Sequence, residues 1–284
     1  MTAIEAALGG LIDYAGLYPP AALDMSAAVR NYLEYREAKH AFILGRFIVN
    51  LARLEEMREA AGSAFGSIRL SVIASEDTAP GLIWRHLDEG FRIESIEIKC
   101  NEPAGAVRLA GHLPDTLERY FEIPMQDSGS AWIETLASIG ARAKLRMGGV
   151  VAEAFPSPQA VALRLHALAS RQLPFKATAG LHHLIRSCHP FTYAAGSAEG
   201  KMHGFLNVIL AATLLYSGGA AGEALHMLEE EDPAAWRATP DAVRSRASQW
   251  DADQLRTVRE KFFMSFGSCS FEEPIRDLEV LGWL

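Results

Sequence analysis

Cysteine is scarce in this sequence of 284 residues. The three cysteines, Cys100, Cys188 and Cys269, lie far apart and are odd in number. They therefore predict neither a disulfide framework nor a zinc site built from closely spaced thiolates. This usage is typical of the reducing cytoplasm. Because the sequence shows no base partner for Cys269, we interpret it as a small packing residue.

Long hydrophobic runs and an excess of positive charge are also missing. The longest apolar stretch, 205–216, is interrupted by Asn207 and falls short of the roughly 20 residues that span a bilayer. Residues 1–5 lack the basic and apolar regions of a signal peptide. The 27 Lys and Arg are outnumbered by 35 Asp and Glu, for a formal net charge of -8. A nucleic-acid groove needs concentrated basic residues, so we expect neither nucleic acid nor a membrane as a partner.

The sequence does contain recurring β-rich runs, most of them followed by a segment with helical spacing. Seven runs cover residues 11–17, 41–49, 67–74, 95–100, 119–124, 142–147 and 174–179. Strands that alternate with helices predict right-handed βαβ units and a parallel sheet. Without a visible linker, these units favour a single (β/α)₈ TIM barrel over residues 1–284, a fold of about 250 residues. An open doubly wound sheet is disfavoured, because no Gly-rich turn follows the first run.

The eighth strand of this barrel is predicted at residues 263–268, followed by a closing helix at 272–281. Residues 205–216 are rich in Ala and Leu, which favours a helix packed outside the barrel. Residues from about 217 to 260 then form a helical excursion before the last strand. The barrel is therefore expected to close only after this insertion.

Ionisable residues are concentrated at the inward positions of the predicted strands. Alternate residues of a barrel strand point inward, and those at the C-terminal strand ends face the active site. Parallel strands are usually almost continuously apolar, and burying an unpaired charge is costly. The charged groups therefore form either a mutually neutralising ion-pair layer or an active site. They are Asp13, Arg46, Glu97, Lys99, Glu122, Lys144, Arg146 and Lys176, with Thr178 beside them.

The sharpest feature of this set is a pair of lysines. Lys144 and Lys176 are about one βα unit apart, so they are expected on adjacent strands. The pKa of a lysine is lowered by a second cation and by partial desolvation, which leaves a neutral amine that can form a Schiff base with a carbonyl. Glu97, Glu122 and Asp13 are the candidates for moving the protons that this reaction requires.

The two predicted strands that carry the lysines resemble those of class I aldolases of the deoxyribose-phosphate aldolase type. The resemblance rests on Lys144-Leu-Arg-Met-Gly-Gly149 and on Phe175-Lys-Ala-Thr-Ala-Gly-Leu181. It implies that Lys144 forms the Schiff base and that Lys176 is its electrostatic partner. Gly267-Ser-Cys-Ser270 is similar to the phosphate loop after strand eight of that family. The chain as a whole also resembles an uncharacterised bacterial protein family.

An anionic substrate is expected from the remaining polar residues. Arginine and lysine bind carboxylate or phosphate groups, and the backbone N–H groups of a strand-to-helix turn add further donors. We therefore expect a small phosphorylated or carboxylated carbonyl compound and no cofactor, and leave assembly into a homo-oligomer open. The predicted binding residues are Arg46, Lys99, Arg146, Thr178, Gly180, His182, His183, Gly267, Ser268 and Ser270.

Three other functions compete with an aldolase-like lyase. Asp13, His182, His183 and His203 offer mixed nitrogen and oxygen ligands for a metal-dependent lyase, although the sequence favours no metal site. The basic residues also suit a phosphoribosyltransferase-like barrel. A barrel that binds an anionic metabolite without turning it over is equally compatible with the fold, because fold alone does not assign function.

Overall fold

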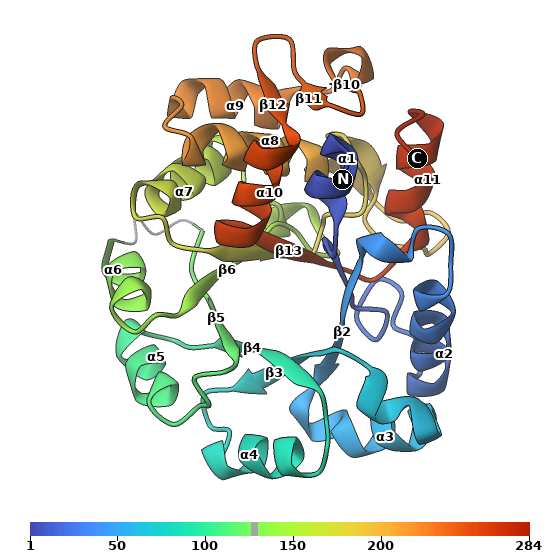
Figure 1. Ribbon diagram of the computed structural model, residues 1–284, viewed down its shortest axis with the longest axis vertical. Coiled ribbons are helices and arrows are strands. Elements are labelled where there is room, and N and C mark those ends of the chain that lie inside the picture. The colour runs from blue at the N-terminus through green and yellow to red at the C-terminus, as the bar shows by residue number, and fades with distance from the viewer. Residues whose placement is uncertain (126–129) are drawn as a thin grey trace.

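Eight parallel strands form a closed barrel in the computed structural model, which describes residues 1–125 and 130–284. The arrangement confirms the predicted (β/α)₈ fold, and the eighth barrel strand is the segment expected for it. Figure 1 shows the helices arranged around the strands. In the order of the chain, the barrel strands are β1 (Ile12–Tyr14), β2 (Leu44–Asn50), β3 (Leu70–Ser75), β4 (Ile93–Lys99), β5 (Glu118–Glu122), β6 (Arg142–Arg146), β7 (Phe175–Thr178) and β13 (Phe263–Ser268).

The helices cover the outside of this barrel. Several begin at residues that satisfy free N–H groups of the first turn: the side chain of Asp24 accepts a hydrogen bond from Ala27, and that of Ser157 accepts one from Ala160. The helices are α1 (Ala3–Leu8), α2 (Met25–Arg36), α3 (Leu54–Ala61), α4 (Pro80–Asp88), α5 (Pro103–Ala110), α6 (Ser130–Ser138), α7 (Pro158–Ser170), α8 (Phe205–Tyr216), α9 (Ala221–Glu229), α10 (Ala252–Lys261) and α11 (Glu272–Val280).

The segment before the last strand differs from the predicted helical excursion. It contains α9 and α10, but between them lies a three-stranded antiparallel sheet of β10 (Arg237–Ala238), β11 (Ala242–Arg244) and β12 (Gln249–Asp251). Strands of two or three residues are too short to show the alternation that identifies a strand in a sequence. The sheet is tied to the start of the chain, because the Ala3 N–H donates to the Pro240 carbonyl at 2.8 Å.

Two further differences concern short elements. The first strand ends at Tyr14, before the predicted end at residue 17. A hairpin of β8 (Ser187–Pro190) and β9 (Glu199–Met202), which the sequence did not suggest, lies between β7 and α8. α8 forms as expected. Pro190 and Met202 of this hairpin help to line a pocket together with Ala179 and Gly180, which follow β7.

The apolar core lies between the barrel and the helices, whereas the barrel interior is polar. Leu70 and Val72 of β3 and Ile96 and Ile98 of β4 are buried. The residues between them have the opposite orientation, because successive strand side chains alternate. One of these, Ser71, donates to the buried Glu97 carboxylate of the neighbouring strand β4 at 2.7 Å. The outward faces therefore supply hydrophobic packing, and the inward faces are free to build a site.

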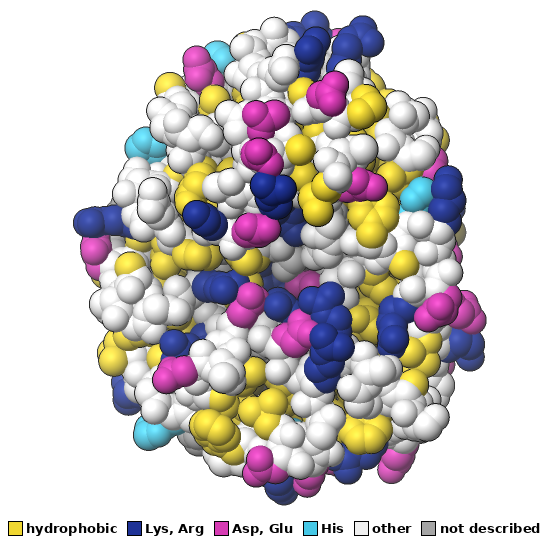
Figure 2. Space-filling view, viewed as in Figure 1, with side chains coloured by type: hydrophobic (Ala, Val, Ile, Leu, Met, Phe, Trp, Pro, Cys, Tyr) yellow, Lys and Arg dark blue, Asp and Glu magenta, His cyan; other side chains and the backbone are white. Residues whose placement is uncertain are grey.

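Charges of both signs occur together on the face drawn in Figure 2, where Lys and Arg side chains alternate with Asp and Glu around a hollow near the middle. This face shows no continuous stretch of one sign. Within residues 1–125 and 130–284, no helix combines the length and apolar character needed to cross a bilayer.

Candidate active site

A chain of alternating charges crosses the barrel interior. Lys176 Nζ donates to Asp13 Oδ2 and to Glu97 Oε1, both at 2.6 Å. The other oxygen of Glu97, Oε2, lies 2.9 Å from Lys144 Nζ. Lys144 Nζ is also 3.3 Å from Glu122 Oε2. The structure thus brings the five predicted catalytic residues into one cluster, in which the Glu97 carboxylate stands between the two ammonium groups.

The inner part of this cluster, Lys176 with Asp13 and Glu97, is buried and hydrogen-bonded. Lys176 is completely buried, and Ser265 Oγ donates to Asp13 Oδ2 at 2.7 Å. Burial would lower the pKa of Lys176, but the charges of Asp13 and Glu97 outweigh it and raise this pKa above its usual value. Burial would likewise raise the pKa of Glu97, but the ammonium groups of Lys176 and Lys144 hold it far below its usual range. Lys176 and Glu97 are therefore a charged pair at neutral pH.

The outer part of the cluster faces a cavity of about 450 Å³. Lys144 lines this cavity, whereas Lys176 does not. Arg146 Nε donates to Glu122 Oε1 at 3.0 Å. Burial would raise the pKa of Glu122, but Lys144 and Arg146 outweigh it and lower this pKa. Lys144 is thus the amine of the cluster that a ligand can reach.

Several predicted binding residues line the same cavity. Lys99 and Arg146, the last residues of β4 and β6, are exposed to solvent. They supply positive charge where a ligand would enter. Tyr18, which the prediction did not include, lines the cavity too. The predicted binding residues in the cavity wall are Lys99, Arg146, Thr178, His182 and Gly267.

Other predicted binding residues have structural roles. Gly180 has φ +68°, and an added Cβ would lie 2.7 Å from Gly148 Cα, so glycine is required for the close approach of two loops. Ser268 Oγ accepts a hydrogen bond from the Ser270 N–H at 3.3 Å. Ser270 Oγ accepts one from the Glu273 N–H at 3.1 Å. These contacts shape the turn between β13 and α11, and binding of an anion there stays a prediction.

Arg46 was wrongly placed at the cavity. It is the third residue of β2, and its guanidinium pairs with Glu94 at 3.0 Å and with Glu118 at 2.8 Å. Those carboxylates stand at the beginnings of β4 and β5. Alternation correctly predicts that Arg46 points inward, but it does not specify the depth along the barrel axis. Arg46 therefore belongs to the N-terminal end of the barrel, remote from the C-terminal strand ends.

Because Arg46 pairs with two partly buried carboxylates, Arg46→Met should lower the free energy of unfolding by about 2 kcal/mol, as expected for hydrogen bonds to charged groups. Arg92 provides the control: it also pairs with Glu94, at 3.1 Å, but its side chain is 54% exposed. Arg92→Met should change stability by no more than about 0.5 kcal/mol. Urea unfolding measures both values, and an equal loss in the two variants would contradict this role of Arg46.

The four residues considered for a metal-dependent lyase do not converge. Asp13 binds Lys176, as described above, and His183 Nδ1 lies 3.1 Å from Asp277 Oδ2. His203 Nε2 donates to the Pro156 carbonyl at 2.7 Å. Burial lowers the pKa of His203 to about 4 despite that bond, so its ring is neutral. His182 contacts Glu273 at 2.9 Å, so the four have different partners, and within the described part of the chain they do not form a group with ligand atoms within 4.8 Å of one another.

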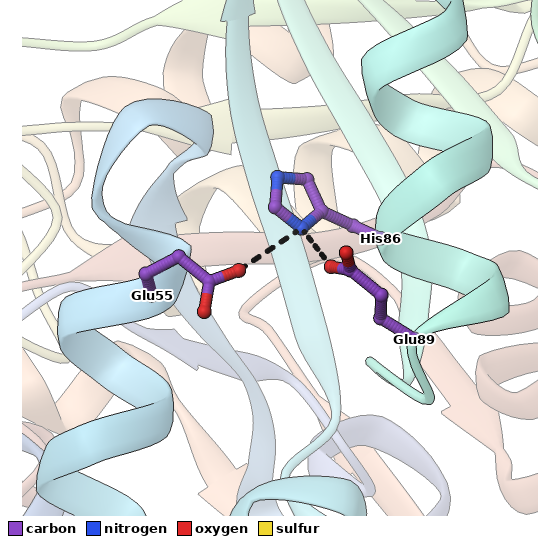
Figure 3. Close-up of side chains that lie close together, drawn as sticks. All are labelled: Glu55, His86 and Glu89. Carbon is purple, nitrogen blue, oxygen red and sulfur yellow. Dashed lines mark hydrogen bonds and ion pairs between the residues drawn. The ribbon is translucent and has the colours of Figure 1, made fainter.

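A different group, on the outside of the barrel, has the spacing of a metal site. Glu55 of α3, with His86 and Glu89 at the end of α4, brings three ligand atoms within 4.8 Å of one another (Figure 3). His86 Nδ1 is 3.7 Å from Glu55 and 3.1 Å from Glu89. Arg58 also lies 3.3 Å from an oxygen of each carboxylate. Since this guanidinium pairs with both carboxylates, we interpret the group as an ion-pair cluster.

Residues beside the cavity form a second polar cluster that the sequence analysis missed. His182 Nδ1 lies 2.9 Å from Glu273 Oε2, and Cys269 Sγ lies 3.9 Å from His182 Nε2. Burial would lower the pKa of His182, but its bonds to Cys269 and Glu273 outweigh burial and raise it to about 9. β7 and β13 pair directly, so the residues that follow them lie near one another. A closed barrel makes its seventh and eighth strands neighbours, and this adjacency could have indicated His182 as a base partner of Cys269.

Comparison with known proteins adds no family. No protein-family model matches the chain, and no curated protein is significantly similar to it. Among solved structures, the chain is similar to muconate cycloisomerase from Pseudomonas fluorescens, with 14% identity and a TM-score of 0.40 over 60% of this chain and 46% of that one. A mandelate racemase/muconate lactonizing enzyme from a marine actinobacterium has 16% identity and a TM-score of 0.38, over 62% of this chain and 51% of that one.

A third solved structure is muconate lactonizing enzyme from Pseudomonas fluorescens complexed with muconolactone, with 14% identity and a TM-score of 0.39. The match covers 84% of this chain and 57% of that one. The chain thus spans about half the length of these three structures. At such low identity the likeness concerns the barrel, and activity has to be argued from the site.

Proposed function

We propose that the protein is a lyase that makes or breaks a carbon–carbon bond in a small anionic carbonyl compound through a Schiff base on Lys144. One observation carries this proposal: Lys144 lines the cavity with carboxylates on two sides, at 2.9 Å and 3.3 Å, while its partner Lys176 is fully buried. A nucleophile that a ligand can reach, next to groups that exchange protons, is the arrangement that imine formation needs.

The proton transfers of this reaction can be assigned to atoms. Lys144 must give a proton to Glu122, 3.3 Å away, before Nζ attacks the carbonyl carbon. The carbonyl electron pair moves to oxygen, which takes up a proton to give a carbinolamine. The first proton on that oxygen is the one that Glu122 took from Lys144. Nζ then gives a second proton to Glu122, 3.3 Å away, which passes it to the same oxygen, and water leaves as the nitrogen electron pair forms the iminium. The resulting iminium withdraws electrons from the neighbouring carbon–carbon bond.

The geometry changes the role expected for Lys176. The sequence suggested that its charge acts directly on Lys144, but the Glu97 carboxylate stands between the two ammonium groups, at 2.6 Å and 2.9 Å. In this proposal Lys176 holds Glu97 ionised and fixed in position. It acts on the reaction through Glu97, as a positioning residue.

The cavity also favours a negatively charged ligand. Lys99 and Arg146 stand at its rim, and guanidinium groups bind carboxylate or phosphate through two parallel hydrogen bonds. Glu122 already accepts hydrogen bonds from two N–H groups of Arg146, at 3.0 Å and 3.4 Å, which leaves the others for a ligand. We therefore propose an aldehyde or keto acid that carries a carboxylate or phosphate group.

Borohydride trapping tests this proposal directly. The protein is incubated with glyoxylate, pyruvate and phosphorylated aldehydes, reduced with borohydride, and digested for mass mapping of lysine adducts. We expect a reduced adduct on Lys144 with at least one compound. The absence of any Lys144 adduct across the panel would overturn the Schiff base. Binding without an adduct would then favour a non-catalytic anion-binding barrel, and magnesium-dependent binding of a phosphoribosyl donor would favour a transferase.

A further inference from the structure

The second cluster at the cavity has the components of a reactive thiol. Cys269 follows β13 and His182 follows β7, and both line the cavity that Lys144 lines. Cys269 Sγ lies 3.9 Å from Nε2 and 4.0 Å from Nδ1 of His182, and Nδ1 also lies 2.9 Å from Glu273 Oε2, so Nε2 is the ring nitrogen left for the thiol. A thiol, an imidazole and a carboxylate in this order are the groups of a cysteine nucleophile with an oriented base.

Glu273 is itself held in place by neighbouring groups. The Tyr193 hydroxyl donates to Glu273 Oε2 at 3.0 Å, and the Glu273 N–H is bound by Ser270 Oγ. Burial would raise the pKa of Glu273, but its bonds to His182 and Tyr193 outweigh burial and lower it. A fixed carboxylate on Nδ1 sets the orientation of the ring and favours the imidazolium form. Glu273 is therefore a positioning residue for His182.

Other titratable groups lie near Cys269 and His182. His183 is engaged by Asp277 at 3.1 Å and stacks on His189, with ring centroids 3.3 Å apart. Tyr193 approaches the thiol from the β8–β9 hairpin, with its hydroxyl 3.7 Å from Cys269 Sγ. Among the described residues, the titratable groups that interact with Cys269 or His182 include Tyr14, His189, Tyr193 and Glu273.

We propose that Cys269 and His182 form a thiolate–imidazolium pair, oriented by Glu273, that adds reversibly to the carbonyl carbon of an anionic aldehyde or keto acid bound in the cavity. The sulfur–carbon bond forms as the carbonyl electron pair moves to oxygen, and His182 gives its proton to that oxygen. The product is a hemithioacetal or hemithioketal, and the reverse steps release the carbonyl compound and restore the pair. This reaction is distinct from Schiff-base formation, because it requires a carbonyl compound bound in the cavity but does not require the Lys144 amine.

The other two cysteines serve as internal controls. Cys100 is buried as Cys269 is, but burial and the charge of Glu76 raise the pKa of its thiol to about 11. Cys188, on β8, is exposed. One protein therefore contains a thiol beside an imidazole, a buried thiol beside a carboxylate, and a thiol open to solvent. Their relative reactivities separate activation by His182 from burial and from access.

Alkylation of the native protein with iodoacetamide, followed by mass mapping, measures all three thiols at once. At pH 6 we expect Cys269 to react at least about tenfold faster than Cys188, because only thiolates react and an ordinary thiol is almost entirely protonated there. Cys100 should remain unmodified. If Cys269 reacts no faster than Cys188 at pH 6, or requires the same alkaline pH, the proposed ion pair is wrong. This comparison uses the unaltered chain and does not depend on the folding of a variant.

Variants assign the effect to individual residues. His182→Asn should abolish the reaction of Cys269 at pH 6, and Glu273→Gln should shift its pH profile upward. The matched control, His183→Asn, removes the neighbouring imidazole and should leave the profile unchanged. A His182→Asn protein that is folded by circular dichroism and still reacts at pH 6 would contradict the proposal.

Glyoxylate tests the ligand class. In Lys144→Arg, which cannot form a Schiff base, glyoxylate should still protect Cys269 from alkylation, and the protection should disappear on dilution. No borohydride-stable adduct is expected on Cys269, since a hemithioacetal releases its aldehyde. Loss of protection in this variant would overturn carbonyl addition at Cys269, whereas a missing Lys144 adduct in the unaltered protein would overturn the lyase proposal. The two failures are thus distinguishable.

Discussion

Lys176→Met should lower the free energy of unfolding by about 3–5 kcal/mol, the loss expected when one partner of a buried ion pair is removed. The side chain of Lys176 is fully buried, and its ammonium group binds Asp13 and Glu97 at 2.6 Å each. Methionine fills similar space but leaves both carboxylates without this cation. Urea unfolding at pH 7 gives the value directly.

The pH dependence of this loss has a definite sign. In the unaltered protein, the folded-state pKa of Glu97 lies below that of the unfolded chain, near 4.3, so its stabilisation is present above that pH and is lost as the pH falls. Removing Lys176 raises the folded-state pKa of Glu97. The variant is therefore destabilised less by acid, and the difference between the two proteins should shrink as the pH falls below about 4.3.

An exposed lysine is the matched control for this substitution. Lys201 pairs with Glu231, and its side chain is 48% exposed. Lys201→Met should change the free energy of unfolding by less than about 1 kcal/mol, because solvent screens such pairs. Equal losses for Lys176→Met and Lys201→Met, or a Lys176→Met loss that grows as the pH falls, would show that the buried charge pair does not stabilise the barrel.

Lys144→Met should eliminate the saturable borohydride-dependent trapping of carbonyl compounds, because it removes the amine proposed to form the Schiff base. Lys144 is the lysine of the cluster that lines the cavity, so no neighbour in that cluster can replace it. Mass mapping after reduction should find only the weak labelling common to exposed lysines. Persistent, saturable labelling of Lys176 in this variant would reverse the assignment of the two lysines.

Two further variants separate the role of the Lys144 amine from the role of positive charge at the cavity. Lys144→Arg keeps a cation beside Glu97 and Glu122 but offers no amine, so it should bind the ligand and form no adduct. Lys99→Met removes a cation at the rim of the same cavity and should retain the Lys144 adduct while requiring more ligand for saturation. A Lys144→Arg protein that is trapped as well as the unaltered protein would contradict a Schiff base at this position.

Much of the candidate site follows from strand alternation. The period of two places Glu97, Lys144 and Lys176 on the inward face of their strands, and the barrel order makes β6 and β7 neighbours, with Lys144 and Lys176 paired in register. Local spacing does not specify depth along the axis, which is why Arg46 was assigned to the wrong end. Nor does it specify that Glu97 stands between the lysines, since this depends on the stagger of β4 against β6 and β7.

The sequence by itself determined the alternation of strands and helices, the position of the last strand and the inward face of each charged residue, because these depend on backbone periodicity over a few residues. The tertiary structure decided which side chains meet. Closure of the barrel brings β13 beside β7, and only then does Cys269, interpreted from the sequence as a packing residue, lie beside His182. Contacts between residues so far apart in the chain depend on register and closure, which short-range patterns do not encode.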